Sequence, residues 1–357
     1  MELITMNRIS ALYRTVVPVC ISPILLLIVT AGLLLSACST GEPLVREPAA
    51  GDVEVANPAV AELIAPSATL QELGSGYEWS EGPVWVEQHG FLLFSDIPNN
   101  VIHKWTPGEG VTEYLSPAGY TGEEERGGES GSNGLYISND GHLLLAQHGD
   151  RRIARMEAPL DDPAPVFTTV AGTYNDRRLN SPNDLVQHSN GDIYFTDPPY
   201  GLEEGMNDPA KELAFQGVYR VTPSGKVILL TDELSRPNGI ELSPNEQTLY
   251  VANSDGSNPV WMAYDITPDG NITNGRVFHD AGAFTGREPG SQDGMDVDAD
   301  GNVYATGPGG VWIFAPDGSL LGKIKTNKPT ANCTIGGPDG KTLYMTADDQ
   351  LLSIPLR

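Results

Sequence analysis

The stretch Asn183-Asp-Leu-Val-Gln-His-Ser-Asn-Gly-Asp-Ile-Tyr-Phe-Thr196 shows the pattern from which the fold follows. An Asn opens a short apolar segment, a polar turn containing Gly comes next, and a run of β-branched and aromatic residues completes the unit. Short apolar runs separated by Asn-Gly turns are typical of antiparallel β-hairpins. The stretch therefore predicts two paired strands.

The same unit occurs six times in the chain, and the other five copies open at Glu81, Asn133, Asn238, Asp293 and Asn332. The copies follow one another at intervals of about 40 to 55 residues, which is the repeat length of β-propeller blades. A second pair of short strands follows the first, as in Gly217-Val-Tyr-Arg-Val221. No unit contains a long segment of helical periodicity, which argues against alternating strands and helices. We therefore predict an all-β fold, a six-bladed β-propeller with four-stranded blades around a central channel, over residues 68–357.

The first 37 residues have the features of an export signal. Arg8 and Arg14 form a basic start, an almost wholly apolar run follows, and the run ends in Leu35-Ser-Ala-Cys38. This end resembles the lipobox of bacterial lipoprotein signal peptides, which implies cleavage before Cys38 and lipidation of its thiol. The alternative is an uncleaved signal anchor, because the run is nearly long enough to span a bilayer.

Both alternatives place the rest of the chain outside the cytoplasm. With lipidation, the expected location is the bacterial cell envelope, on the periplasmic side of the outer or inner membrane in a Gram-negative cell. Residues 38–67 are rich in Ala, Pro, Glu and Gly without periodicity, which predicts a flexible tether. The lipid anchor is then the only expected contact with a membrane.

The charge of the chain limits its partners. It has 47 acidic and 21 basic residues and a formal net charge of −26, which disfavours nucleic acid and anionic lipid surfaces and favours cations. Cys333 is the only cysteine that remains after Cys38 is lipidated and the first 37 residues are removed, so no disulfide is expected within the mature chain. We expect a monomer or a weak dimer.

The opening residues of the six units are the candidates for a functional site, because equivalent positions of successive blades form a ring at one mouth of the channel. All six carry side-chain oxygens, from two carboxylates and four amides. Such a set suits a hard divalent cation, with Ca²⁺ first, Mg²⁺ or Mn²⁺ next and Zn²⁺ still possible. The alternative is a turn role, since Asn-Gly and Asp-Gly are common turn sequences. Glu81 occupies the same position of the repeat, and Glu is not a typical turn residue. Its presence there favours a functional site.

Several motifs occur in a fixed order along the chain. They are Ser80-Glu-Gly-Pro-Val-Trp85, Leu179-Asn-Ser-Pro-Asn-Asp-Leu-Val186, Tyr194-Phe-Thr-Asp-Pro-Pro-Tyr-Gly201, Arg236-Pro-Asn-Gly239, Asp293-Gly-Met-Asp-Val-Asp298, Gly301 to Phe314 and Ala331-Asn-Cys333. Together these motifs resemble the gluconolactonase branch of the senescence-marker-protein (regucalcin)/gluconolactonase family. The similarity covers nearly all of the chain from about residue 70, and the motifs are more specific for the family than for a substrate.

The resemblance implies roles for particular residues. Glu81, Asn238 and Asp293 would be direct ligands of the metal. Asn183 would lie at both metal and substrate, as a ligand or through water, and Asp293 would also be the general base. Asp184 would orient Asn183 or contact the substrate.

Three further residues are candidates for contact with the substrate. Asn133 belongs to the ring, and Tyr200 would line the channel mouth or pack its own loop. His148 lies in a His-Gly-x-Arg-Arg element that the gluconolactonase branch shares, and it would contact substrate, relay a proton or serve as a hydrogen-bonded structural histidine. In animal members an Arg that grips sugar hydroxyls lies two residues before the Asn183 position, and this chain has Ser181 there. The acidic, Gly-rich loop 119–131 would be a lid or a solvated loop.

These expectations combine into a metal-dependent hydrolase of a small-molecule, sugar-type lactone. The cation would polarise the lactone carbonyl as a Lewis acid, and Asp293 would take a proton from the attacking water or act as a nucleophile itself. Two alternatives remain. One is hydrolysis of phosphotriesters or other esters on the same metal site, and the other is a non-catalytic propeller that serves as a binding surface or scaffold in the envelope.

Overall fold

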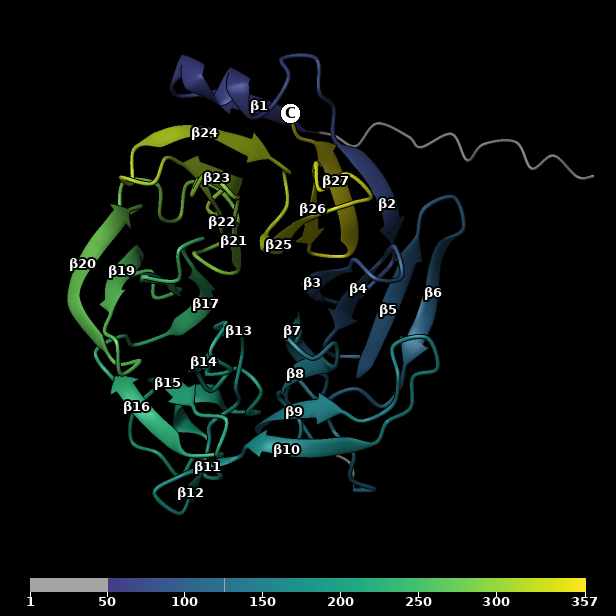
Figure 1. Cartoon of the computed structure of the whole chain (residues 1–357), viewed down its shortest axis with the longest axis vertical. Helices are drawn as coiled ribbons and strands as arrows, with labels where there is room; N and C mark the ends of the chain where they lie inside the picture. Colours follow the sequence, from purple (N-terminus) through teal and green to yellow (C-terminus); the bar gives the residue numbers. More distant parts are fainter. Residues whose placement is uncertain (1–50, 125) are drawn as a thin grey trace, which may run out of the picture. The chain divides into compact units, whose positions relative to one another are not determined.

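A computed structural model describes residues 51–124 and 126–357 of the chain, and the predicted signal peptide and Cys38 lie outside these residues. The described residues form six β-sheets of four or five antiparallel strands, together with one short two-stranded hairpin. Figure 1 shows the six sheets arranged in a ring, in chain order around a common centre. The predicted six-bladed propeller of four-stranded blades is thus confirmed.

The first three blades each run from the inside outward along the chain. The first consists of β3 (Ser80–Val86), β4 (Phe91–Asp96), β5 (Val101–Thr106) and β6 (Gly110–Leu115). The second consists of β7 (Ser132–Ile137), β8 (Leu143–Gln147), β9 (Arg152–Met156) and β10 (Phe167–Ala171). The hairpin β11 (Thr173–Tyr174) and β12 (Arg177–Arg178) follows. The third consists of β13 (Leu185–Gln187), β14 (Ile193–Asp197), β15 (Gly217–Val221) and β16 (Val227–Thr231), with the 3₁₀ turn η2 (Gly205–Asn207) between β14 and β15.

The last three blades continue the ring. The fourth consists of β17 (Pro237–Leu242), β18 (Thr248–Asn253), β19 (Val260–Ile266) and β20 (Ile272–Asp280). The fifth contains β21 (Met295–Val297), β22 (Val303–Gly307), β23 (Gly310–Phe314) and β24 (Leu320–Lys325). The sixth contains β25 (Thr330–Gly336), β26 (Thr342–Ala347) and β27 (Gln350–Pro355).

The N-terminal part of the described chain closes the ring. The strand β2 (Gln71–Ser75) pairs with β27 and supplies the outer strand of the sixth blade. This pairing joins residues from the two ends of the chain, so the last blade depends on both. Closure of this kind leaves each blade between two neighbours.

Residues 51–67, part of the segment whose composition predicts a tether, pack on the propeller. The strand β1 (Asp52–Val55) pairs with β24 as a fifth strand of the fifth blade. The 3₁₀ helix η1 (Pro58–Glu62) follows, and Val60 and Ile64 are each 2% exposed within an apolar cluster of the fifth and sixth blades. The ordered fold therefore begins before residue 68, because two apolar side chains in a polar, Pro-rich segment find a partner surface.

The apolar core lies between the blades. Each of the six clusters of buried apolar residues in the described chain joins two neighbouring blades. The cluster between the first two, for example, combines Leu93 with Leu145, both wholly buried. A propeller sheet thus buries both faces, which explains why its second strands are almost continuously apolar.

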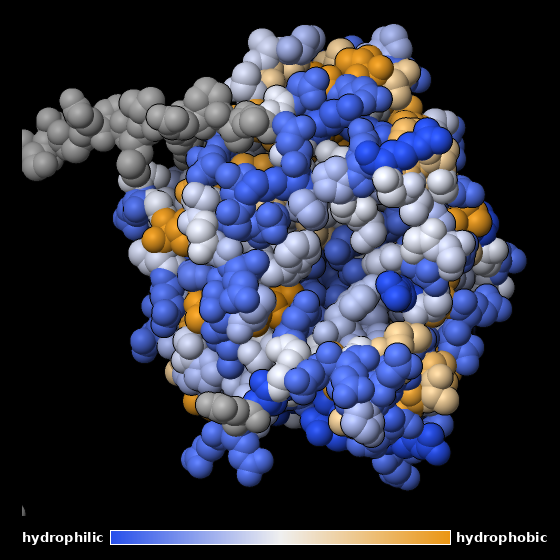
Figure 2. All heavy atoms as spheres, turned by 180° about the vertical axis from the view of Figure 1, so that it is seen from behind, coloured by the Kyte–Doolittle hydropathy of each residue, from blue (hydrophilic) through white to orange (hydrophobic). Residues whose placement is uncertain are grey.

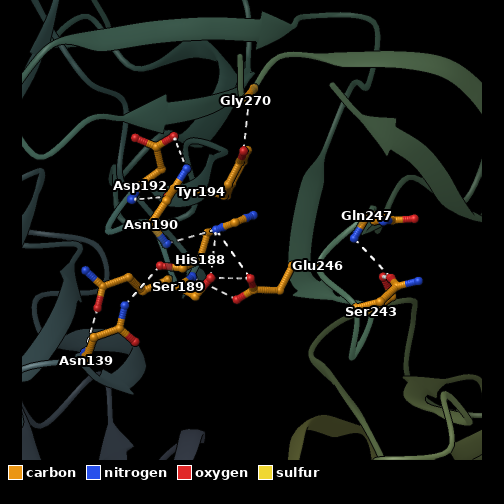
Figure 3. A network of polar contacts seen from close by, with 12 residues as sticks. Asn139, His188, Ser189, Asn190, Asp192, Tyr194, Ser243, Glu246, Gln247 and Gly270 are labelled. Carbon is orange, nitrogen blue, oxygen red and sulfur yellow. Dashed lines mark hydrogen bonds and ion pairs between the residues drawn. The ribbon is translucent and has the colours of Figure 1, made fainter. Parts of the chain in front are cut away.

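Polar turns add hydrogen bonds between neighbouring blades (Figure 3). The backbone N–H of Asn139, in the second blade, donates to Gln187 Oε1 of the third at 2.7 Å. Ser189, in the third blade, donates through its backbone N–H and its Oγ to the carboxylate of Glu246 in the fourth, at 2.8 and 2.5 Å. The neighbouring His188 belongs to this turn network and lies away from the site described below.

The face of the molecule shown in Figure 2 is hydrophilic over most of its area and is hollowed near its middle. Apolar side chains on this face are scattered, which agrees with the acidic composition of the chain. Within residues 51–124 and 126–357, no helix has the length and apolar character needed to cross a bilayer.

Candidate active site

The inner strands lose their regular pairing at the residues that open the sequence repeat. In four blades the register with the second strand shifts there, between Glu81 and Val84, Ser132 and Leu135, Pro237 and Ile240, and Thr330 and Asn332. In the other two blades, β13 and β21 begin only after Asn183 and Asp293. An irregularity of this kind redirects a side chain out of the alternating pattern. The side chains of the opening residues can therefore point into the channel.

A Gly follows the opening residue in four of the six units, and at Gly134 and Gly239 it permits close approach of neighbouring inner strands. A Cβ on Gly134 would lie 2.5 Å from Asp184 Oδ1, and a Cβ on Gly239 would lie 2.2 Å from the carbonyl oxygen of Asp293. Neither of these two glycines has a positive φ, so neither is required for a turn conformation. The Asn-Gly pairs at Asn133 and Asn238 thus serve packing at the channel, and the turn interpretation does not hold for them.

A pocket of about 230 Å³ brings together five of the six opening residues, namely Glu81, Asn133, Asn183, Asn238 and Asp293. Tyr200 lines the same pocket, as the sequence predicts. The blades supply these residues from sequence positions more than 200 residues apart, so only the closed ring assembles them.

The two ring carboxyls lie in a strongly acidic environment. Burial, together with the charges of Asp184 and Glu129, raises the pKa of Glu81 to about 8. Burial also raises the pKa of Asp293 well above its usual range, and the charge of Glu81 adds to this effect. Gly82 N–H donates to Glu81 Oε2 at 2.9 Å and partly opposes the shift. Two like-charged carboxyls in one pocket thus favour binding of a proton or a cation.

The amide side chains of the ring present oxygens without partners. The Oδ1 atoms of Asn133 and Asn238 are buried and accept no hydrogen bond within the described residues. The Nδ2 group of Asn238 donates to Ser254 Oγ at 2.8 Å, which fixes the amide so that Oδ1 is the free end. A buried oxygen without a partner is costly, and a ligand in the pocket, cation or substrate, would satisfy these oxygens.

The donor set fits a hard divalent cation. It consists of carboxylate and amide oxygens and contains no His or Cys, which is the ligand chemistry of Ca²⁺ or Mg²⁺. No group of three or more His, Cys, Asp or Glu side chains in the described residues is arranged to hold a metal ion. A cation here would therefore depend on the Asn amides as well as on Glu81 and Asp293.

Asp184 and Asn332 do not line this pocket. They belong to a second cavity of about 220 Å³ in the channel, together with Glu241 and Asp296. Asp184 accepts hydrogen bonds from the backbone N–H groups of Leu185 at 2.9 Å and Ile240 at 3.4 Å. Its neighbour Asn183 lines the candidate site, so consecutive residues serve different cavities. The structure thus assigns Asp184 to the channel rather than to the substrate pocket.

His148 is wholly buried and does not line the pocket. The neighbouring Glu129 lines the pocket instead. His148 Nδ1 lies 2.9 Å from Glu129 Oε2.

Ser181 is also wholly buried, and its Oγ donates to the carbonyl of Pro198 at 2.6 Å and accepts from Gly201 N–H at 2.9 Å. Ser181 is therefore occupied by its own loop and provides no group for a ligand.

The pocket also contains residues for which the sequence predicts no individual role at the site. These are Trp79, Ile97, Glu129, Arg236, Ser254 and Ser291. Trp79 and Arg236 lie two residues before ring positions, which is a signal that sequence reasoning could have used. Glu129 comes from the acidic loop 119–131, where Glu123 and Glu124 are exposed and Glu129 faces the site.

Comparison with known proteins finds relatives that match most of the chain. The family model described as SMP-30/Gluconolactonase/LRE-like region matches residues 79–349. A gluconolactonase of Zymomonas mobilis subsp. mobilis is 38% identical over 310 residues, which cover 85% of this chain and 86% of that protein. The solved structure of a gluconolactonase from Xanthomonas campestris is 31% identical with a TM-score of 0.74, over 87% of this chain and 97% of that one.

A solved regucalcin from Agrobacterium tumefaciens, described as a calcium-binding protein, shares the fold. It is 21% identical, with a TM-score of 0.62, over 80% of this chain and 93% of that one. The propeller and its oxygen-rich pocket define a class of six-bladed propeller enzymes. Within that class, the chain belongs to the SMP-30/gluconolactonase/LRE-like family. The expected class of enzyme, a gluconolactonase-like hydrolase of lactones, is thereby confirmed.

Proposed function

We propose that the protein hydrolyses a sugar-type lactone to its hydroxy acid with the help of a divalent cation. The observation that carries the proposal is the pocket in which Glu81, Asp293 and the free amide oxygens of Asn133 and Asn238 converge. This pocket occurs in a chain that is 38% identical to a gluconolactonase. Its volume of about 230 Å³ suits a single small ring rather than a polymer.

In this proposal Glu81, Asn238 and Asp293 hold the cation, with Asn183 as a further ligand or as its water-mediated neighbour. Ca²⁺ is the first candidate, and it would supply Lewis-acid polarisation of the lactone carbonyl. Asp293 removes the proton from the attacking water; it lines the same pocket as Tyr200, and its charge acts on the Tyr200 hydroxyl. The Tyr200 ring forms part of the wall beside the substrate.

We also propose that the enzyme acts at the bacterial cell envelope, anchored by a lipid on Cys38. The support is the apolar run that ends in Leu35-Ser-Ala-Cys38. A palmitate-labelling experiment on cells that express the full chain, with Cys38→Ala as its control, tests this part separately.

The enzymatic proposal is tested by acid release from D-glucono-1,5-lactone. We expect turnover that a chelator abolishes and a divalent cation restores. Asp293→Asn should lower kcat/KM by about 10²- to 10⁴-fold, the usual contribution of a general base, whereas Asp300→Asn, an exposed aspartate of the same blade, should leave it unchanged. Turnover that persists both in chelator and in Asp293→Asn would contradict the proposal.

A further inference from the structure

Glu129 is the one carboxylate of the pocket that is not an opening residue of a repeat unit. It lies on the loop between the first and second blades and lines the site together with Glu81 and Asp293. Its side chain is 35% exposed. Its Oε2 is 2.9 Å from His148 Nδ1, and its Oε1 has no hydrogen-bond partner within the described part of the chain. One oxygen is thus anchored while the other is available to a ligand.

The loop that carries Glu129 is tied down on both sides. Arg126 donates to the carbonyl oxygens of Gly149 and Gly201, in the second and third blades. Gly131 N–H donates to the carbonyl of Ile97 at 2.8 Å, and a Cβ on Gly131 would lie 2.5 Å from the same oxygen. Glu129 lies between these two anchors, so its carboxylate is held in place before a ligand arrives. Such preorganisation lowers the entropic cost of binding.

His148 orients this carboxylate. Its ring is wholly buried, its backbone N–H donates to the carbonyl of Gly131 at 3.1 Å, and its Nε2 has no partner among the described residues. Since an ionised carboxylate only accepts hydrogen bonds, Nδ1 carries the proton in this pair. His148 is therefore a positioning residue that acts through Glu129.

The chemistry of the free oxygen indicates what it recognises. The reacting part of a lactone, its carbonyl and ring oxygen, consists of acceptors only and gives a carboxylate nothing to bind. The hydroxyl groups on the ring of a sugar lactone are donors, and a carboxylate accepts strong, charge-assisted hydrogen bonds from them. A buried site that pairs with substrate hydroxyls rejects analogues that lack them.

We propose that Glu129, held by His148, selects polyhydroxylated lactones by accepting hydrogen bonds from their ring hydroxyls. The inference rests on the proposed lactonase function and adds the residue that separates sugar lactones from simple ones. It assigns Glu129 no part in the bond-breaking step.

The test compares two lactones of equal ring size, D-glucono-1,5-lactone and δ-valerolactone, which lacks hydroxyls. In Glu129→Ala, kcat/KM for gluconolactone should fall by about 10- to 100-fold, the usual cost of losing a hydrogen bond to a charged group. The value for δ-valerolactone should stay within about twofold of wild type. Glu129→Gln keeps the size of the side chain and should lower the preference in the same direction, even if the Ala variant does not fold.

Glu124→Gln is the matched control, because it removes the same charge from an exposed position of the same loop. It should leave the preference unchanged. An effect of charge on the cation or on Asp293 would act on both substrates alike and cancel in the ratio. Equal losses for both lactones, or no loss for either, would overturn the inference.

A binding measurement separates this inference from the proposed function. D-glucono-1,5-lactam and δ-valerolactam are stable analogues of the two substrates, and their affinities can be measured by calorimetry without turnover. Glu129→Ala should weaken only the hydroxylated lactam, by about tenfold or more. If wild type hydrolyses neither lactone, the proposed function fails, and the lactam contrast still decides the role of Glu129. If wild type hydrolyses gluconolactone and Glu129→Ala keeps its preference in both assays, the inference alone fails.

Positioning by His148 has its own signature. If His148 acts through Glu129, the double variant Glu129→Ala/His148→Asn should lose no more substrate preference than Glu129→Ala alone. Additive losses of preference would show that His148 acts independently.

Discussion

At the scale of single residues, the ring combines acidity with unsatisfied amide oxygens. Glu81 and Asp293 have raised pKa values because desolvation and the charges of neighbouring carboxyls disfavour their ionised forms, and Asn133 and Asn238 each keep one oxygen without a partner. Each of these features costs stability in the absence of a ligand. A cation held by Glu81, Asn238 and Asp293 would remove the costs at these three residues at once, which is the physical reason to expect tight binding.

Replacement of Glu81 tests this residue-scale argument. We expect Glu81→Gln to weaken binding of Ca²⁺ by about two orders of magnitude, since the number of charged ligands sets the affinity of such sites. Titration calorimetry on chelator-treated protein measures the change. Glu78→Gln, an exposed glutamate three residues earlier in the chain, is the control and should bind Ca²⁺ as wild type does. Equal affinities of the two variants would remove Glu81 from the set of ligands.

At the scale of elements, β1 and η1 extend the propeller beyond its blades. β1 adds an edge strand to the fifth blade, and η1 with the turn after it brings Val60 and Ile64 against Leu321 and Leu70. The side chains of Val60 and Ile64 are almost wholly buried, whereas Val55 in β1 is 61% exposed. The stabilising contribution of this segment therefore comes from η1 and its turn rather than from the outward side chains of β1.

Two truncations of side chains distinguish these contributions. Ile64→Ala should lower the free energy of unfolding by about 2–4 kcal/mol, through lost burial and the cavity that remains. Val55→Ala should change it by less than about 0.5 kcal/mol, because its side chain is already in water. Chemical denaturation followed by tryptophan fluorescence measures both. Equal effects would mean that the segment does not pack on the blades in solution.

At the scale of the whole molecule, the channel gathers carboxyl groups from three blades. Asp184, Glu241 and Asp296 line the second cavity, and no Lys, Arg or His is among its described lining residues. Burial raises the pKa of Asp184 to about 7 and that of Glu241 well above its usual range, where the charge of Asp296 adds to the effect. No single blade has this property, because each contributes one carboxyl.

These raised pKa values predict how stability depends on pH. A carboxyl whose folded pKa exceeds its unfolded pKa stabilises the fold fully below the unfolded value, near 3.8 for Asp184, and the stabilisation is lost as the pH rises through the folded value, near 7. With chelator present, the melting temperature should therefore fall between pH 5 and pH 8. Glu241→Gln should reduce this fall, by removing one of the groups that must ionise in the channel.

Glu233→Gln, an exposed glutamate just before the fourth blade, is the control and should keep the wild-type slope. A melting temperature that rises from pH 5 to pH 8 in chelator would contradict the prediction. Restoration of stability at pH 8 by a divalent cation would identify cation binding as the compensating factor.

The number and kind of blades follow from the sequence because a propeller repeats a local pattern. Each inner strand pair is a hairpin, and its apolar runs and turn residues lie within about 20 residues of one another. The opening residues Glu81, Asn183, Asn238 and Asp293 stand at equivalent positions of this pattern, so their convergence could be predicted as well. The propeller's symmetry converts a sequence period into a ring in space.

Only the tertiary structure decides which of the two channel cavities a residue lines. Asn183 and Asp184 are adjacent in sequence, yet they line different cavities, since successive side chains diverge where the inner strand begins. Glu129 reaches the pocket because Arg126 and Gly131 tie its loop to the blades around it. These outcomes depend on contacts between segments far apart in the chain, and no local pattern of residues encodes such contacts.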